Sequence, residues 1–346
     1  MLAPSRLVSF AVVLAGVVAA VDPAAIYDGG FGNNTNSSIL LNIGNGGAGQ
    51  SGLVKGTFQL QYGNIRSLLV AVYLIVSDTP ALADAFIQDR VANGSKPFKV
   101  AWYQSDTTYS IRYLQSGTID VGITYSPAAE QVAIEQGIAT APSYYSFRDH
   151  FLIVGPPSNP ANLSSSSSIL TMFSDLHKAA EAATAPLPVR FLSRYDKSAT
   201  NIKESVLWLS IGQVRILEYR IIARLTNPSF PLQVPWATAY STWYHQYIAF
   251  PIQALTAAIL LNEYTLTDRG TFLSLPSDLT NRTTVYKAST DDESDPLLNP
   301  AHLLVGARAQ NPDVAKAFAQ WLVGSRGQGF IIGFKKNGQQ LYTPAP

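Results

Sequence analysis

Short apolar runs alternate with longer segments whose apolar residues recur at helical spacing, and this pattern continues along most of the chain. Strands are predicted at residues 38–43, 98–103, 119–125, 151–154, 189–192 and 264–267. Helices are predicted at residues 52–62, 79–91, 108–115, 126–137, 171–183 and 251–263, and from residues 202 and 311 onward. Strands that alternate with helices are typical of parallel sheets covered by helices, so an α/β fold is expected.

The N-terminal segment has a different pattern. Arg6 is followed by an apolar run over residues 7–19, which is shorter than the roughly 20 residues that a membrane span needs. We interpret residues 1–20 as a secretory signal peptide and residues 21–37, which are rich in Gly and Asn, as a flexible leader. No later stretch is apolar for long enough to span a membrane.

Composition narrows the class of protein. Hydrophobic residues make up 47% of the 346 residues, charged residues 14%, and the formal net charge is +1, which does not favour a nucleic-acid partner. There is no cysteine, so neither disulfides nor thiolate chemistry are available. Five N-glycosylation sequons, together with the signal peptide, indicate a secreted glycoprotein of eukaryotic, fungal-like origin. They begin at Asn33, Asn36, Asn93, Asn162 and Asn281.

Residues 44–49 match the glycine pattern of dinucleotide-binding loops and lie between a predicted strand and a predicted helix. That fingerprint also needs an acidic residue about 20 positions later, and no Asp or Glu occurs between Asp28 and Asp78. A nicotinamide or flavin cofactor is therefore not expected. The glycines still allow backbone N–H groups to approach an anion closely.

Known catalytic patterns are missing from the sequence. It contains neither a G-x-S-x-G elbow nor an H-E-x-x-H motif, and its four histidines are scattered. We therefore predict no catalytic residue, no cofactor and no resident metal site.

Residues 191–202 are the strongest candidate for a binding site. A short strand is followed by Arg194, by the hydroxyls of Ser198 and Thr200, and by Asn201 as the expected cap of a helix that begins near Ile202. A guanidinium, hydroxyls and the start of a helix together make a good anion cradle. A purely structural Arg–Asp pair beside a capped helix is the alternative interpretation.

The order of several motifs resembles the tungstate-binding component of bacterial ABC importers, a type II periplasmic binding protein. The resemblance covers nearly the whole chain after the leader. The matching residues are Gln50-Ser51-Gly52-Leu53, Ile119-Asp120-Val121, Ser126-Pro127-Ala128-Ala129-Glu130, Phe151–Pro156, Ser193–Thr200, Trp243-Tyr244, Tyr264–Thr271, Asn299-Pro300 and Asn337–Tyr342.

This resemblance implies two α/β lobes, each a mostly parallel sheet flanked by helices, that hold a small inorganic oxyanion in the cleft between them. Lobe 1 is expected to comprise residues 38–148 and 288–346, and lobe 2 residues 149–287. The family's Ser-Arg clamp falls on Ser193 and Arg194. The implied ligand-binding residues are Gly49, Gln50, Ser51, Thr107, Thr108, Ser193, Arg194, Ser198 and Thr200.

Two departures from the family pattern bear on the ligand. Gly44 to Ala48 replace a hydroxyl-rich segment, and Asp106 stands where the family has glycine. The first change removes hydroxyl donors, and the second brings a negative charge towards an anion. Tungstate, molybdate, phosphate, sulfate and small organic acids therefore all remain candidate ligands.

Two other classes of function stay open at this stage. One is a two-lobed enzyme that acts on a phosphate- or carboxylate-bearing molecule, and the other is an extracellular interaction protein with a vestigial cleft. The favoured interpretation is a secreted, monomeric solute-binding protein without nucleic-acid partner or membrane span, for which the sequence does not decide whether an ABC transporter partner exists.

Overall fold

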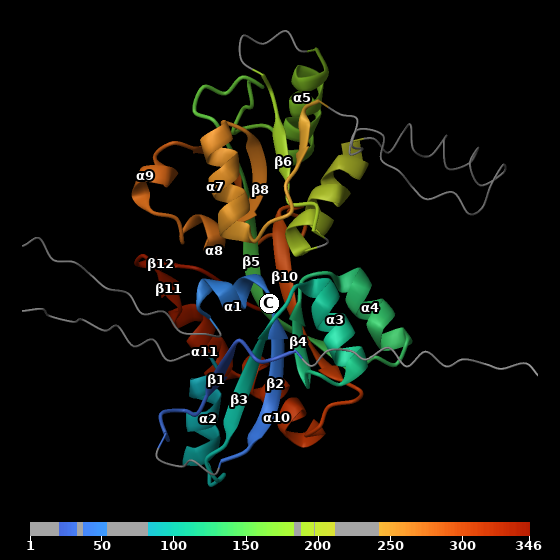
Figure 1. Cartoon of the computed structure of the whole chain (residues 1–346), viewed down its shortest axis with the longest axis vertical. Helices are drawn as coiled ribbons and strands as arrows, with labels where there is room; N and C mark the ends of the chain where they lie inside the picture. Colours follow the sequence, from blue (N-terminus) through green and yellow to red (C-terminus); the bar gives the residue numbers. More distant parts are fainter. Residues whose placement is uncertain (1–20, 33–36, 54–81, 183–187, 197, 212–241) are drawn as a thin grey trace, which may run out of the picture.

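A computed structural model of the chain describes residues 21–32, 37–53, 82–182, 188–196, 198–211 and 242–346. These residues form two lobes, drawn one above the other in Figure 1. The predicted signal peptide, the sequons at Asn33 and Asn36, and most of the helix predicted at 52–62 lie outside the described residues.

The first lobe, in the lower half of Figure 1, contains a mixed sheet in the order β1-β3-β2-β4-β10-β5. Strands β3, β2 and β4 are parallel, while β1 and β10 run antiparallel to their neighbours. Its strands are β1 (Ala25–Tyr27), β2 (Ile39–Asn45), β3 (Lys99–Gln104), β4 (Val121–Thr124), β10 (Leu298–Gly306) and the short β13 (Thr343–Pro344). Its helices are α1 (Gly47–Ser51), α2 (Leu82–Ala92), α3 (Thr107–Ser116), α4 (Pro127–Glu135), α10 (Pro312–Val323) and α11 (Ser325–Gly333), followed by the hairpin β11 (Lys335–Lys336) and β12 (Gln339–Gln340).

One long strand, β5 (Ala139–Gly155), belongs to both lobes. Its first part pairs with β10 and its last part with strands of the second lobe, so the sheet is continuous through the junction. The chain returns to the first lobe between β9 (Thr284–Ala288) and β10. Two crossings therefore connect the lobes.

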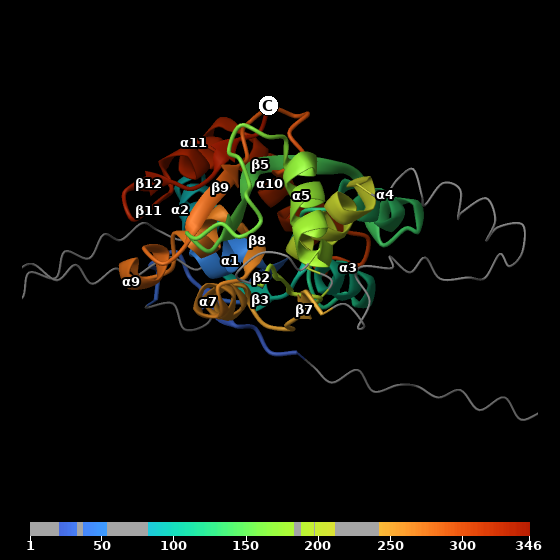
Figure 2. The ribbon, with the colours of Figure 1, turned by 90° about the horizontal axis from the view of Figure 1, so that it is seen from above.

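The second lobe repeats the parallel arrangement around β6 (Phe191–Ser193), which lies between β7 (Tyr244–Gln246) and β8 (Tyr264–Asp268). In Figures 1 and 2, α5 (Ile169–Ala182) and α7 (Pro251–Leu261) cover opposite sides of these strands. Residues 199–211 are helical, and α8 (Arg269–Phe272) and α9 (Ser277–Thr280) are short. The α/β prediction is confirmed, and the crossing strands make the sheet mixed because they run antiparallel to the parallel strands.

Each lobe has its own aromatic core. In the first lobe, Phe86 packs edge-on against Phe318, with ring centroids 5.0 Å apart. In the second, Trp208 contacts Phe173, Trp243 and Tyr244. The tandem aromatics at 243 and 244 therefore pack inside the lobe, as their high apolar content favours.

Part of the predicted flexible leader is ordered. Ala25–Tyr27 forms β1 and pairs antiparallel with β3 at the edge of the sheet, and Tyr27 is buried. The strand was not predicted, because it has only three residues and lies in a sequence rich in glycine. A strand this short has no periodicity that a sequence window detects.

One helix forms in the segment before the predicted helix at 52–62, which was read as a loop, and another predicted helix begins earlier than expected. Helix α1 starts at Gly47, since Gly46 allows a close turn in which a Cβ would lie 2.6 Å from the Ser105 carbonyl oxygen. The helix expected from Ile202 starts at residue 199, and Ser198 takes the capping role predicted for Asn201. The Ser198 carbonyl accepts from the Ile202 N–H at 2.8 Å, and its Oγ from the Asn201 N–H at 3.4 Å.

Candidate functional site: a cavity between the lobes

A cavity of about 800 Å³ lies between the lobes, where the starts of several helices meet. Its lining includes residues at the starts of α1, α3, α7 and the helix at 199–211. In α/β folds the carboxyl ends of parallel strands and the helices that follow them face such a crevice. Helix N-termini carry free N–H groups and the positive end of the dipole, so the cavity has a positive backbone potential.

The first-lobe wall is the start of α3. Asp106 caps this helix by accepting from the Tyr109 N–H at 2.7 Å. Thr107 is only 3% exposed, and its Oγ1 has no hydrogen-bond partner among the described residues. A buried hydroxyl without a partner is costly, so Thr107 is a donor held ready in the cavity lining.

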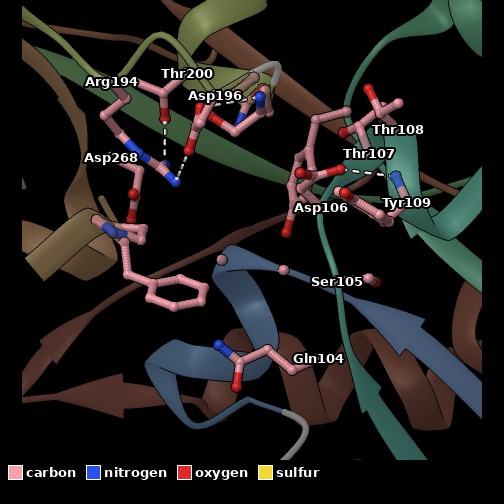
Figure 3. Close-up of a pocket in the computed structure, with 18 of the residues that line it drawn as sticks. Gln104, Ser105, Asp106, Thr107, Thr108, Tyr109, Arg194, Asp196, Thr200 and Asp268 are labelled. Atoms are coloured by element: carbon pink, nitrogen blue, oxygen red, sulfur yellow. Dashed lines mark hydrogen bonds and ion pairs between the residues drawn. The ribbon is translucent and has the colours of Figure 1, made fainter. Parts of the chain in front are cut away.

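The second-lobe wall is the loop after β6. The Arg194 guanidinium forms an ion pair with Asp196 and donates from Nε to the Ala249 carbonyl at 3.2 Å. Its Nη1 lies 3.5 Å from Thr200 Oγ1, and the guanidinium side chain is 10% exposed. Tyr195 has a φ of 47°, which a non-glycine residue rarely adopts. Figure 3 shows Asp106 and Asp196 on facing sides of the cavity.

A buried network fixes the base of this loop. Ser193 Oγ donates to Glu204 at 2.8 Å, and the Tyr244 hydroxyl donates to the other carboxylate oxygen at 2.5 Å. The Tyr195 N–H donates in turn to Ser193 Oγ at 3.2 Å. Burial raises the pKa of Glu204 to about 7, although the hydrogen bonds from Tyr244 and Ser193 oppose the rise.

Carboxylates outnumber guanidinium groups in the cavity lining. Burial raises the pKa of Asp106, and the backbone N–H groups at the start of α3 oppose the rise. The charged residues of the lining are Asp106, Asp149, Asp196, Asp268, Arg112 and Arg194. Helix starts and hydrogen bonds offset part of this negative charge, since Asp106 and Asp268 both cap helices.

The structure brings five of the predicted binding residues together. These are Thr107, Thr108, Arg194, Ser198 and Thr200, all of which line the cavity. Their role towards an anion stays a prediction. Sequence reasoning recognised Asp196 only as a structural partner of Arg194 and did not assign Asp149, Asp268 and Asn299 to the site, although Asp268 and Asn299 lie in segments that carry the family resemblance.

Two other predicted binding residues, both serines, are placed differently. Ser193 is fully buried in the network below the loop. Ser51 Oγ donates to the Ala48 carbonyl at 2.9 Å and shares a 2.7 Å hydrogen bond with the Tyr342 hydroxyl. Neither serine is among the lining residues. Gly49 and Gln50 belong to α1, and Gly47, the first residue of that helix, lines the cavity.

The PBP superfamily domain matches residues 77–326. The chain belongs to the PBP superfamily. Two curated relatives are similar in sequence. An anion-binding protein provisionally assigned to an ABC transporter, from Haloferax volcanii, is 28% identical over 71% of this chain and 63% of its own length. The tungstate-binding protein TupA of Peptoclostridium acidaminophilum is 25% identical over 69% of this chain and 72% of its own.

Solved structures share this fold. A periplasmic protein provisionally assigned to metal binding is 57% identical, with a TM-score of 0.74, and the match covers 93% of this chain and 99% of the other. The tungstate-binding protein TupA from Desulfovibrio alaskensis G20 is 19% identical, with a TM-score of 0.61 and coverage of 89% and 99%. In this superfamily protein, the described residues contain no helix long and apolar enough to cross a membrane.

Proposed function

We propose that this PBP superfamily protein is an exported solute-binding protein that holds a small oxyanion in the cavity between its lobes. The observation that carries the proposal is the convergence of helix starts with the Arg194 guanidinium and the unpartnered Thr107 hydroxyl. Oxyanions accept several short, charge-assisted hydrogen bonds, and this arrangement supplies donors from both lobes.

The names of two relatives support this proposal, one for anions in general and one for tungstate. The Haloferax volcanii protein is named for anion binding and the Peptoclostridium acidaminophilum protein for tungstate binding. The chain spans 63% of the length of the Haloferax volcanii protein. That the chain shares the activity of that whole protein is therefore part of the proposal. The proposed function has four further parts: the ligand is a tetrahedral oxyanion, the protein is exported from the cell, it is a monomer, and it delivers the ligand to an ABC transporter.

The structure suggests how binding proceeds. The Asp196 carboxylate is paired with the Arg194 guanidinium. An oxyanion that binds to Arg194 therefore shares the guanidinium with Asp196 or displaces the Asp196 carboxylate. The two crossings through β5 and between β9 and β10 allow the lobes to approach each other. Closure would place Thr107 and Thr108 of the first lobe against the same ligand that Arg194 holds.

A thermal-shift panel on the purified protein tests the proposal. Tungstate, molybdate, sulfate and phosphate are compared, since a ligand at 100 times its dissociation constant adds about 2.7 kcal/mol of stability. We expect at least one of these anions to raise the melting temperature, and Arg194→Ala to weaken its binding about 10- to 100-fold, because charge-assisted hydrogen bonds are lost.

Arg190→Ala is the matched control, because Arg190 directly precedes β6 as Arg194 directly follows it, has an exposed guanidinium and does not line the cavity. It should bind like the unmodified protein. An absence of any shift, or equal binding by Arg194→Ala, would contradict the proposal.

A further inference from the structure

The cavity contains a second group of polar side chains that differs from the anion cradle. Asp149 on β5 pairs in register with Asn299 on β10, and Phe151 on β5 pairs with Asp268 on β8. Because residues two apart on a strand face the same side, these neighbours converge on one surface. Asp149, Asn299 and Asp268 all line the cavity.

The side chains of this group offer mainly hydrogen-bond acceptors. Asn299 Nδ2 donates to Asp149 Oδ2 at 3.2 Å, which leaves Asn299 Oδ1 as the free end of the amide. Asn299 is 3% exposed, and its Oδ1 has no hydrogen-bond partner within the described ranges. A buried amide oxygen without a donor is as unfavourable as an unpaired hydroxyl, so Asn299 Oδ1 is an acceptor left for a donor of the ligand.

A fully deprotonated oxyanion does not satisfy this group, because it brings only acceptors and negative charge. Arg269 acts electrostatically on Asp149, and Lys336 on Asp268, yet neither cation lines the cavity. A cavity of about 800 Å³ is also much larger than one tetrahedral ion requires. The ligand therefore has room for a second, donor-bearing part.

An ammonium group fits the acceptors best. It has three donors and one positive charge, which match two carboxyl groups and one amide oxygen. Within the described residues, no group of three or more His, Cys, Asp or Glu side chains is placed to hold a metal ion. Tyr125 and Phe151 also line the cavity, and aromatic rings attract organic cations.

We propose that the cavity takes a zwitterionic ligand, with its oxyanion at Arg194 and Thr107 and its ammonium group at Asp149, Asp268 and Asn299. This inference rests on the proposed oxyanion site and defines the class of molecule that carries the oxyanion. An organic amine with a phosphonate or similar tetrahedral end group has this chemistry.

Titration calorimetry with two matched probes tests the inference. The probe 2-aminoethylphosphonate carries both groups, whereas ethylphosphonate lacks the amine; 3-aminopropylphosphonate extends the spacing. We expect at least one amine-bearing probe to bind the unmodified protein at least tenfold more tightly than ethylphosphonate. Asp149→Asn should remove this advantage and leave ethylphosphonate binding unchanged, while Asp295→Asn, outside the cavity, should change neither.

A second readout needs no variant. Burial and the neighbouring Asp268 raise the pKa of Asp149 well above its ordinary range, while Arg269 opposes the rise. An arriving ammonium group stabilises the ionised carboxyl pair, so binding of the amine-bearing probe should release a proton that ethylphosphonate binding does not. Calorimetry in buffers of different ionisation enthalpy measures this release.

The outcomes separate the two proposals. If ethylphosphonate or phosphate binds as tightly as the amine-bearing probes and no proton is released, the zwitterion inference is overturned and the oxyanion site stands. If neither the inorganic anions nor any phosphonate binds, both proposals fail.

Discussion

The two walls of the cavity supply comparable donors but are held in place by different means. In the first lobe, the start of α3 is set by a local bond in which Asp106 accepts from the N–H three residues later. In the second lobe, the loop that carries Arg194 depends on Glu204, which is buried below it and bonded to β7 through Tyr244. One wall is thus a local element and the other a product of tertiary packing.

This difference teaches where the site is sensitive. A local cap needs only a short side chain that accepts a hydrogen bond, and several residue types supply it. A buried carboxyl group with several donors has no equivalent substitute, because removing it leaves hydroxyl groups unpaired inside the core. We therefore expect the second-lobe wall to tolerate less change than the first.

Replacing Glu204 should have the largest effect. Glu204→Ala strands the hydroxyls of Ser193 and Tyr244, and we expect it to reduce the free energy of unfolding by about 3 kcal/mol. Urea denaturation measures the loss. Asp106→Ala is the matched truncation on the first wall and should cost about 1 kcal/mol, the typical cost of losing a helix cap. Equal losses in the two variants would refute the comparison.

The pH dependence of stability sharpens the same point. The folded-state pKa of Glu204 is raised from 4.5 to about 7, so the folded protein binds more protons than the unfolded chain between these values. The contribution of Glu204 to stability is therefore largest at the acidic end of this window and falls as the pH rises towards 7. In Glu204→Gln this fall should become smaller, while the contribution of Glu130, whose pKa burial also raises to about 7, remains.

Neutralising Asp196 should have a moderate effect on binding. Asp196→Asn removes the carboxylate that is paired with Arg194, so an oxyanion no longer competes with it. We expect sulfate or tungstate to bind about tenfold more tightly, equivalent to about 1.4 kcal/mol. Calorimetry measures the gain. Weaker binding would show instead that Asp196 orients the guanidinium for the ligand.

The smallest effect should come from Thr107→Val, which removes the unpartnered hydroxyl while keeping the side chain's shape. The stability of the unliganded protein should not fall, whereas anion affinity should drop about two- to tenfold, the worth of one hydrogen bond. Thr265→Val is the contrasting variant, because Thr265 Oγ1 donates to the Leu192 carbonyl at 2.8 Å. It should lose stability and keep its affinity.

Much of the fold was readable because its signals are local. The predicted strand at 119–125 contains β4, and Pro251 marks the start of α7, since proline is favoured at the first helical position. The length of β5 was underestimated, because its first part contains polar residues and Pro142 and is held by pairing with β10. Strand β10 was not predicted for the same reason.

The candidate site likewise has a part that local sequence predicts and a part that depends on contacts between distant segments. The sequence by itself determined the α/β class and the Arg194 loop, because apolar periodicity and a strand–loop–helix motif depend on residues close together in the chain. Only the tertiary structure decided that Asp149, Asp268 and Asn299 share that cavity. They come from strands far apart in sequence, and the register between such strands is set by the packing of the whole sheet.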